Sequence, residues 1–376
     1  GQVFAGEVGA DSRKEYTVIG DAINLAARLA ERAKASEILI DSAVYESIHD
    51  RVDSETCDPI LAKGIETPVQ TFRILNVARA TEPSTGLLSL IGRDAEIAQM
   101  RGALQKAIGG DGQIVTVVGE AGIGKTRLVQ ELIEEARKAD VFTVVGRCQI
   151  HSATRPYASW TEILESLLDI GSGSVEDRTD HIESILEKIE PGYGRWSPVL
   201  SDALSFTIPD SDLTRSLPPE ERQPRLYRIV TDFLSTRAQQ GPLTVVFEDA
   251  HWMDVSSQEL MLYLASQIEG TPILMVVSSR PDLDLDSYSG YAHHLSLNLE
   301  ELDESASLSL FAQTMGLEDI SDQLNDLVRD QAKGNPLFVQ GVAKSLLETD
   351  MVTRDVLTGE YQLDTTQPDW VVPDNL

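Results

Sequence analysis

An apolar run, a glycine-rich loop and a Lys-Thr pair follow one another at residues 114–126, and this order constrains the fold most. The segment reads "IVTVVGEAGIGKT". Its β-branched run predicts a strand buried on both faces, with a helix from Gly124. Gly119, Gly124, Lys125 and Thr126 match the spacing G-x-x-x-x-G-K-[ST]. Such glycines let backbone N–H groups turn around a phosphate, next to the positive end of a helix.

The loop is therefore a predicted nucleotide-phosphate site. Lys125 is expected to reach the β- and γ-phosphates, and Thr126 to hold Mg²⁺. The alternative is a glycine-rich turn with a chance lysine, and the spacing does not fit a dinucleotide motif. The candidate nucleotide-binding residues are Gly119, Glu120, Ala121, Gly122, Ile123, Gly124, Lys125 and Thr126.

A phosphate loop needs an acidic partner, which we expect at the end of a neighbouring strand. The segment "PLTVVFEDAHWMD" supplies a buried strand at 243–247, followed by Glu248 and Asp249. One carboxylate would bind Mg²⁺ and the other would polarise the attacking water, with the assignment left open. A solvated strand end is the alternative. Asp254 is expected to cap the next helix, and His251 is interpreted as structural before catalytic.

The 376 residues allow two or three domains. Further strands at 141–145 and 273–278, separated by helices, predict an α/β fold with a parallel sheet, and from Glu301 the pattern is helical. The segment "ARATEPSTG" predicts a linker. We predict a first domain at 1–77, a linker at 78–87, an ATPase domain at 88–300, and a helical lid with the start of another domain at 301–376.

The first 77 residues carry a different pattern. We expect strands at 2–8 and 15–19 joined by a polar loop, and then a helix capped by Asp21 that runs to about Lys34. A strand at 37–41, a helix at 42–48 and a strand at 68–75 follow.

The net charge of the chain limits the classes of molecule that it is expected to bind. A formal charge of −30 and a pI near 4.4 disfavour nucleic acids and anionic membranes. Cys57 and Cys148 have no metal-type spacing, so we expect two reduced thiols in a cytoplasmic protein. No apolar run approaches the roughly 18 residues of a membrane span. Gly1 and Leu376 do not look like natural ends, and we expect an internal fragment.

Residues 88–350 resemble the signal-transduction ATPases of the AAA-related STAND group. The resemblance is carried by "IGRDAEI", the phosphate loop, "FEDAHWMD", "SSRP" and "GNPLFV". It implies ATP and Mg²⁺, with Arg280 sensing the γ-phosphate and Pro336 packing near the base. The plainer alternatives are a surface arginine before a proline turn and an ordinary helix start, since proline is common in a first helical turn.

Residues 1–77 resemble the C-terminal half of a class III nucleotidyl cyclase domain, most specifically in "EYTVIGDAINLAARL". The resemblance implies a partial α+β domain that converts ATP to cyclic AMP and pyrophosphate. Asn24 would orient the ribose and Arg28 would stabilise the transition-state phosphate. Their spacing of four puts both on one helix face, and the surrounding alanines allow close packing. The alternative is an ordinary amphipathic helix.

Two weaker assignments come from the same resemblance. Thr17 stands where the family reads the purine, and Lys63 where it contacts the triphosphate; a plain strand residue and an exposed lysine are the alternatives. The family's two metal-binding aspartates, which take Mg²⁺ or Mn²⁺, and its adenine-reading lysine would lie before residue 1. The family site spans two subunits, so the resemblance implies a homodimer.

Two hypotheses of function follow. The first is an adenylyl cyclase in intracellular signal transduction, regulated by the ATPase module. The second is an ATP-switched scaffold or transcriptional regulator with a degenerate cyclase-like domain. The presence of both Asn24 and Arg28 favours the first, and the two upstream aspartates would decide between them.

Overall fold

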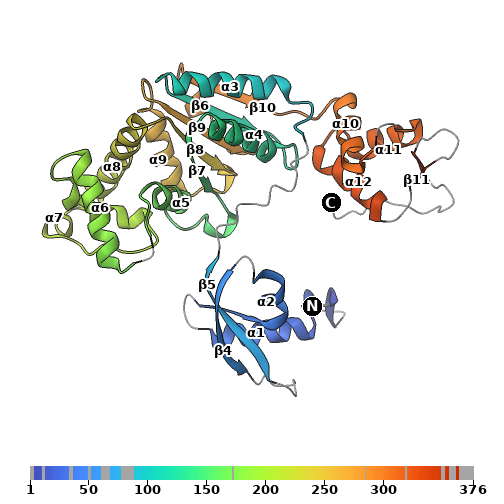
Figure 1. The fold of residues 1–376 in the computed structure, drawn as a ribbon, viewed down its shortest axis with the longest axis horizontal. Coiled ribbons are helices and arrows are strands. Elements are labelled where there is room, and N and C mark those ends of the chain that lie inside the picture. Colours follow the sequence, from blue (N-terminus) through green and yellow to red (C-terminus); the bar gives the residue numbers. More distant parts are fainter. Residues whose placement is uncertain are drawn as a thin grey trace. The chain divides into compact units, whose positions relative to one another are not determined.

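The computed structural model describes residues 4–10, 13–33, 37–49, 52–60, 68–77, 89–171, 173–283, 285–317, 320–348, 352–354 and 361–363. The chain divides into two compact units, Gly1–Leu87 and Leu88–Leu376 (Figure 1). Each unit has its own sheets and helices. None of the described helices is long and apolar enough to cross a bilayer.

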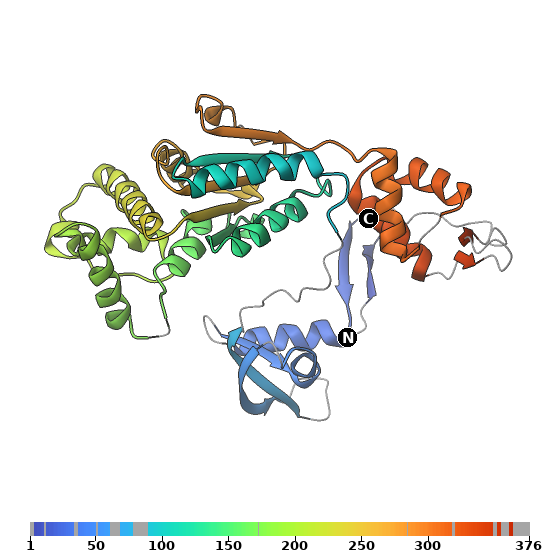
Figure 2. The same cartoon turned by 45° about the horizontal axis from the view of Figure 1, so that its top comes forward.

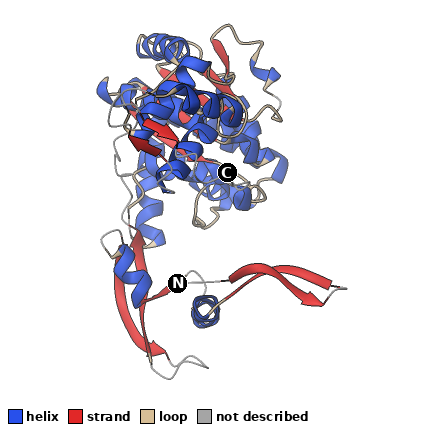
Figure 3. Cartoon of the chain, turned by 90° about the vertical axis from the view of Figure 1, so that its right-hand side faces the viewer, coloured by secondary structure: helices blue, strands red, loops and turns tan. Residues whose placement is uncertain are grey.

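The first unit contains a two-stranded ribbon and a three-stranded sheet, both antiparallel. Figure 3 draws the ribbon in red; it pairs β1 (Phe4–Ala10) with β2 (Arg13–Ile19). The sheet has the order β3-β5-β4. Its strands and the helices of the unit are β3 (Ile38–Asp41), β4 (Val52–Ile60), β5 (Val69–Val77), α1 (Asp21–Arg32) and α2 (Ser42–Ile48).

Two expectations for this unit were wrong, and one of its strands was not predicted. Gly20, not Asp21, is the N-cap of α1, and Asp21 is already the first helical residue. The ribbon strands extend into the predicted polar loop, because β1 runs to Ala10 and β2 begins at Arg13. β4 was not predicted, since its sequence "VDSETCDPI" is rich in residues that strands disfavour. It forms by pairing with β5 across two register shifts.

The second unit is built on five parallel strands in the order β10-β6-β9-β8-β7 (Figure 1). Four of them fall within two residues of the predicted strands, so the predicted parallel sheet is confirmed. β10 was not predicted; it is a five-residue edge strand in which only Leu297 is buried. The strands are β6 (Gln113–Val118), β7 (Phe142–Arg147), β8 (Leu243–Glu248), β9 (Ile273–Ser279) and β10 (His294–Asn298).

Apolar layers cover both faces of this sheet. Val115 and Val117 of β6 pack with α3 (Asp94–Ile108) and α4 (Lys125–Lys138), which lie side by side in Figures 1 and 2. Ile114 points to the other layer. There it joins the core residues of α5 (Ala158–Leu167), α6 (Val175–Ile189), α8 (Pro219–Gln239) and α9 (Val255–Ala265). This double burial explains the nearly continuous apolar runs of the central strands.

Short helical segments complete the region around α5–α9: η1 (Ile150–Ser152), η2 (Tyr193–Ala203), α7 (Asp212–Arg215), η3 (Ala250–Trp252) and η4 (Asp286–Tyr288). The chain then forms a helical lid around its own apolar core. The lid helices are α10 (Glu304–Met315), α11 (Asp322–Ala332) and α12 (Pro336–Glu348). The helical pattern predicted from Glu301 is thus observed as far as Glu348. A small antiparallel pair that was not predicted follows: β11 (Val352–Arg354) and β12 (Tyr361–Leu363).

Candidate nucleotide site

The phosphate loop lies between the end of β6 and the start of α4. Gly122 (φ 76°) and Gly124 (φ 100°) both have left-handed backbone angles, which residues with a Cβ rarely adopt. α4 begins at Lys125, directly after the loop. The first N–H groups of a helix have no partner within it, so they are available to an anion at this position.

Lys125 is folded over the loop. Its side chain is buried, and Nζ donates to the carbonyl oxygens of Gly119 (2.7 Å) and Glu120 (2.8 Å). Burial lowers the pKa of Lys125, whereas the carboxylate of Asp249 raises it and the charge of Arg280 lowers it. The ammonium group of Lys125 therefore interacts electrostatically with Asp249 and Arg280, which the sequence analysis predicted for the same site.

The two acidic candidates face different surroundings. Asp249, with a left-handed backbone (φ 55°), donates its N–H to Ser278 Oγ (3.2 Å) and lines the same cavity as Lys125 and Thr126. Glu248 is buried at the end of β8, and its Oε2 lies 3.4 Å from Nε of Arg147. Glu248 is not among the described residues that line the cavity. The structure therefore brings Asp249, and not Glu248, to the phosphate loop.

The acidic pair does not follow a strand adjacent to β6, so that expectation was wrong. β9 lies between β6 and β8, because each parallel strand returns through a helical crossover and sequence order does not fix its place in the sheet. β9 carries the third part of the site. The carbonyl of Ser279, its last residue, accepts a hydrogen bond from the N–H of Gly119 (3.2 Å), and the next residue, Arg280, lines the cavity.

The lid contacts the backbone of the phosphate loop. Nδ2 of Asn335 donates to the carbonyl of Ala121 (3.0 Å), and the N–H of Leu337 donates to the carbonyl of Gly122 (3.2 Å). A Cβ built on Gly122 would lie 2.7 Å from Cβ of Leu337, so a residue with a side chain does not fit there. Pro336, between these two donors, lines the cavity. The lid is thus joined to the loop that is expected to hold phosphates.

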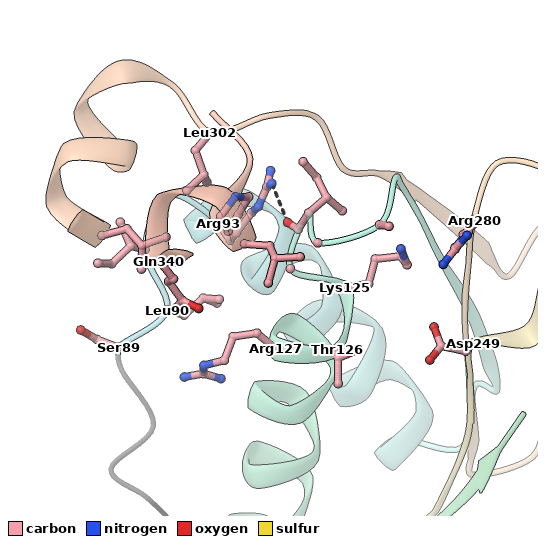
Figure 4. Close-up of a pocket in the computed structure, with 18 residues that line it drawn as sticks. Ser89, Leu90, Arg93, Lys125, Thr126, Arg127, Asp249, Arg280, Leu302 and Gln340 are labelled. Carbon is pink, nitrogen blue, oxygen red and sulfur yellow. Dashed lines mark hydrogen bonds between the residues drawn. The ribbon is translucent and has the colours of Figure 1, made fainter. Parts of the chain in front are cut away.

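Arg93 is a buried residue of the site that the sequence analysis did not single out. Its Nη2 donates to the carbonyls of Ile123 (3.2 Å, dashed in Figure 4) and Glu300 (2.6 Å). One guanidinium therefore joins the start of α3, the phosphate loop and the entry to the lid. The arginine in "IGRDAEI", a charged residue directly before an amphipathic helix, was the signal available in the sequence.

These elements enclose a cavity of about 420 Å³, a size typical of small-ligand sites. Figure 4 shows Lys125, Asp249 and Arg280 on one side of it, and Leu90 and Gln340 on the other. Four basic residues and one acidic residue line the cavity, although the whole chain has a net charge of −30. This local reversal of charge suits an anionic ligand. The basic residues are Arg93, Lys125, Arg127 and Arg280.

The same cavity offers oxygen ligands for a divalent metal ion. No group of three or more His, Cys, Asp or Glu that could hold a metal ion occurs in the described residues. Mg²⁺ bound with a nucleotide does not need one, since substrate phosphates and water supply most of its ligands. Thr126 and Asp249 both line the cavity and offer oxygen donors, so these residues fit Mg²⁺ held together with phosphates.

The cyclase-type residues lie in the first unit. Asn24 and Arg28 are both exposed on α1. Arg28 Nη1 contacts Oε2 of Glu31 at 2.8 Å, an exposed pair of the kind that contributes little stability. Thr17 belongs to β2, where its backbone pairs with Gly6, and its side chain lies outside the described residues. Lys63 also lies outside the described residues.

Two further side chains, Asp254 and His251, follow Asp249 in the sequence. Asp254 caps α9 by accepting from the N–H of Ser257 (2.9 Å), which confirms the predicted cap. It also accepts from the N–H groups of Tyr157 and Ala158. The ring nitrogens of His251 are buried without a hydrogen-bond partner in the described structure. Burial, and then the charge of Arg280, lower the pKa of His251. A role for His251 stays untested.

The fold and the site define a P-loop nucleotide-binding protein with a parallel sheet and a helical lid. The chain belongs to the AAA ATPase domain family, whose description matches residues 89–277, just over half of its length. A domain of unknown function matches residues 303–355, in the lid region. The coarse prediction of an ATP-binding AAA domain is confirmed by this match.

Two relatives cover different shares of the chain. An uncharacterised protein of Rhizobium meliloti (strain 1021) is 27% identical over 282 residues, which cover 72% of this chain and 27% of that protein. Adenylate cyclase 1 of the same organism is 33% identical over 82 residues, or 21% of this chain and 12% of that protein. The chain thus spans at most about a quarter of these relatives.

Among solved structures, the chain is similar to a STAND protein with a tetratricopeptide repeat sensor from Pyrococcus horikoshii. The sequence identity is 13%, the TM-score is 0.37, and the match covers 65% of this chain and 29% of that one.

Asp249→Asn should slow ATP hydrolysis by about 10²- to 10⁴-fold, the usual contribution of a general base, while ATP affinity changes only a few-fold. Glu248→Gln should have a smaller effect, because Glu248 pairs with Arg147 outside the cavity. Steady-state phosphate release and nucleotide titration measure the two quantities, with exposed Asp111→Asn as the control. A larger loss in Glu248→Gln than in Asp249→Asn would reverse the assignment.

Gly122→Ala should displace the lid, because the new Cβ meets Leu337 at a position that already has a positive φ. Gly110→Ala is the matched control: Gly110 also has a positive φ, but open space surrounds it. We expect faster hydrogen exchange over residues 334–348 in Gly122→Ala than in Gly110→Ala. Equal exchange in the two variants would contradict the lid contact.

Proposed function

We propose that residues 88–348 form an ATP-driven switch of the STAND type that regulates an adenylyl cyclase, of which residues 1–77 provide the C-terminal half. One observation carries the ATPase part of this proposal. Lys125, Thr126, Asp249 and Arg280 line a single cavity that Pro336 of the lid also lines. Membership of the AAA ATPase family supports ATP as the ligand.

Hydrolysis at this cavity follows from the positions of the side chains. Water attacks the γ-phosphorus, the bond from phosphorus to the β–γ bridging oxygen breaks, and ADP and phosphate form. Asp249 accepts a proton from the water or orients it. The ammonium of Lys125 exchanges the loop carbonyls for phosphate oxygens, and Arg280 balances charge on the γ-phosphate. Mg²⁺ would be held by Thr126 together with the phosphates, and it would neutralise phosphate charge.

The lid contacts suggest how hydrolysis is transmitted. The carbonyls of Ala121 and Gly122 belong to the loop that wraps the phosphates, and both accept hydrogen bonds from the lid. Each such bond contributes about 1 kcal/mol net. Their sum is small enough for the gain or loss of phosphate contacts to shift the lid between two positions. Arg93 would couple the same loop to Glu300, where the lid begins.

The cyclase part of the proposal is supported by Asn24 and Arg28. Both are exposed and four residues apart on α1, so they can meet a nucleotide held against a second subunit. Similarity to Adenylate cyclase 1 of R. meliloti also supports this part. In the reaction, the ribose 3′-oxygen attacks the α-phosphorus and pyrophosphate leaves. Arg28 would stabilise charge on the α-phosphate, within a homodimer that provides carboxylates for Mg²⁺ or Mn²⁺.

Lys125→Ala should abolish stabilisation by ATP, because it removes the only ammonium that lines the cavity in the described structure. For the unchanged chain, ATP at 100 times its dissociation constant should add about 2.7 kcal/mol to the free energy of unfolding. Thermal melts with and without ATP measure the difference. Lys138→Ala, at the exposed end of α4, is the control. Full stabilisation of Lys125→Ala by ATP would refute the site.

Arg28→Ala should reduce cyclic AMP formation by roughly 10²- to 10³-fold in a protein in which this chain follows the N-terminal half of its cyclase domain, since it removes a transition-state donor. ATP hydrolysis at the P-loop should not change. Arg32→Ala, at the exposed end of the same helix, serves as the control. Equal loss of both activities would argue against separate sites, and undiminished cyclic AMP formation would contradict the role of Arg28. No cyclic AMP formation by the unchanged protein would favour the scaffold hypothesis.

A further inference from the structure

We infer that Gln340 of the lid reads the nucleotide base and makes the P-loop site selective for adenine over guanine. This inference rests on the proposed ATP site, and it adds the residue that determines specificity. The cavity has two chemically different ends. The side that contains Lys125, Asp249 and Arg280 suits phosphates, whereas Figure 4 shows the apolar side chains of Leu90 and Leu302 away from it. The other apolar residues that line the cavity are Ile91, Leu310, Pro336 and Leu337.

An apolar end binds the faces of a base but does not identify it, so a polar group is needed. Besides Gln340, the polar side chains lining the cavity outside its phosphate end are Ser89, Arg93 and Arg127. Ser89 Oγ accepts from Nε2 of Gln313, and Arg93 donates to two loop carbonyls. Arg127 is paired with Glu131 (2.8 Å). Each of these three side chains already has at least one partner within the protein, and the two arginines can only donate.

Gln340 differs from them. It is half-buried, it lines the cavity, and its carboxamide makes no hydrogen bond within the described part of the chain. Figure 4 shows it near Leu90, away from Lys125. Gln340 follows Pro336 by four residues in α12, so the two share one face of the helix. A base that packs against Pro336 would therefore have its edge within reach of the next helical turn.

A carboxamide matches the N6/N7 edge of adenine, because it donates to N7 and accepts from the N6 amino group. Guanine has two acceptors, O6 and N7, on the same edge, so the carboxamide oxygen would face another oxygen. A bidentate pair of this kind discriminates between bases by roughly 5- to 150-fold. Since Gln340 belongs to the lid, the identity of the base and the docking of the lid would depend on one contact.

The test measures binding of ATP, GTP and purine riboside triphosphate, which lacks the N6 amino group, to the whole chain. Gln340→Leu removes both hydrogen-bonding atoms at similar volume. The unchanged chain should prefer ATP to each of the other two nucleotides by on the order of 10-fold. Gln340→Leu should lose most of this preference through weaker ATP binding. Gln331→Leu, an exposed change on α11, should keep it.

The outcomes separate the two claims. If the unchanged chain binds none of the three nucleotides, the proposed ATP site itself fails. If it binds ATP and Gln340→Leu retains the full preference over GTP and purine riboside triphosphate, only the role of Gln340 fails. Gln340→Met, which keeps the length of the side chain but removes both hydrogen-bonding atoms, repeats the measurement if the leucine variant is unfolded. A preserved preference in that variant would overturn the inference as well.

Discussion

The second unit depends on five strands that run in one direction between two apolar layers. Burial on both faces fixes the strands, and their common direction brings all of their carboxyl ends to one edge of the sheet. The phosphate loop follows β6, Asp249 follows β8 and Arg280 follows β9. Groups more than one hundred residues apart in the sequence therefore meet at one edge of the sheet.

The local parts of this arrangement could be predicted from the sequence. β6, β8 and β9 are almost entirely buried, so each appears as an apolar run, and glycine spacing identifies the loop. Strand order could not be predicted, because it depends on where each helical crossover returns to the sheet; β9 therefore lay unexpectedly between β6 and β8. β4 and β10 have too few buried apolar residues to stand out.

Long-range contacts of the site were also hidden in the sequence. Arg93 donates hydrogen bonds to two backbone carbonyls, and one of them belongs to Glu300, about two hundred residues away in the sequence. No local sequence pattern predicts a contact over that separation. The difference between Glu248 and Asp249 likewise arises from Arg147 on the neighbouring strand β7. Adjacent carboxylates in one sequence motif acquire different environments because successive residues at a strand end point in different directions.

The lid meets the phosphate loop partly through main-chain groups, since the N–H of Leu337 and the carbonyl of Gly122 form one of its hydrogen bonds. Every amino acid except proline carries that N–H. Leu337 can therefore be replaced during evolution by another residue with a main-chain N–H. The replacement changes the lining of the cavity but keeps the hydrogen bond to Gly122. The ligand preference of the cavity can therefore change while this hydrogen bond between the lid and the phosphate loop is kept. Proteins with the same attachment of the lid can then respond to different small molecules.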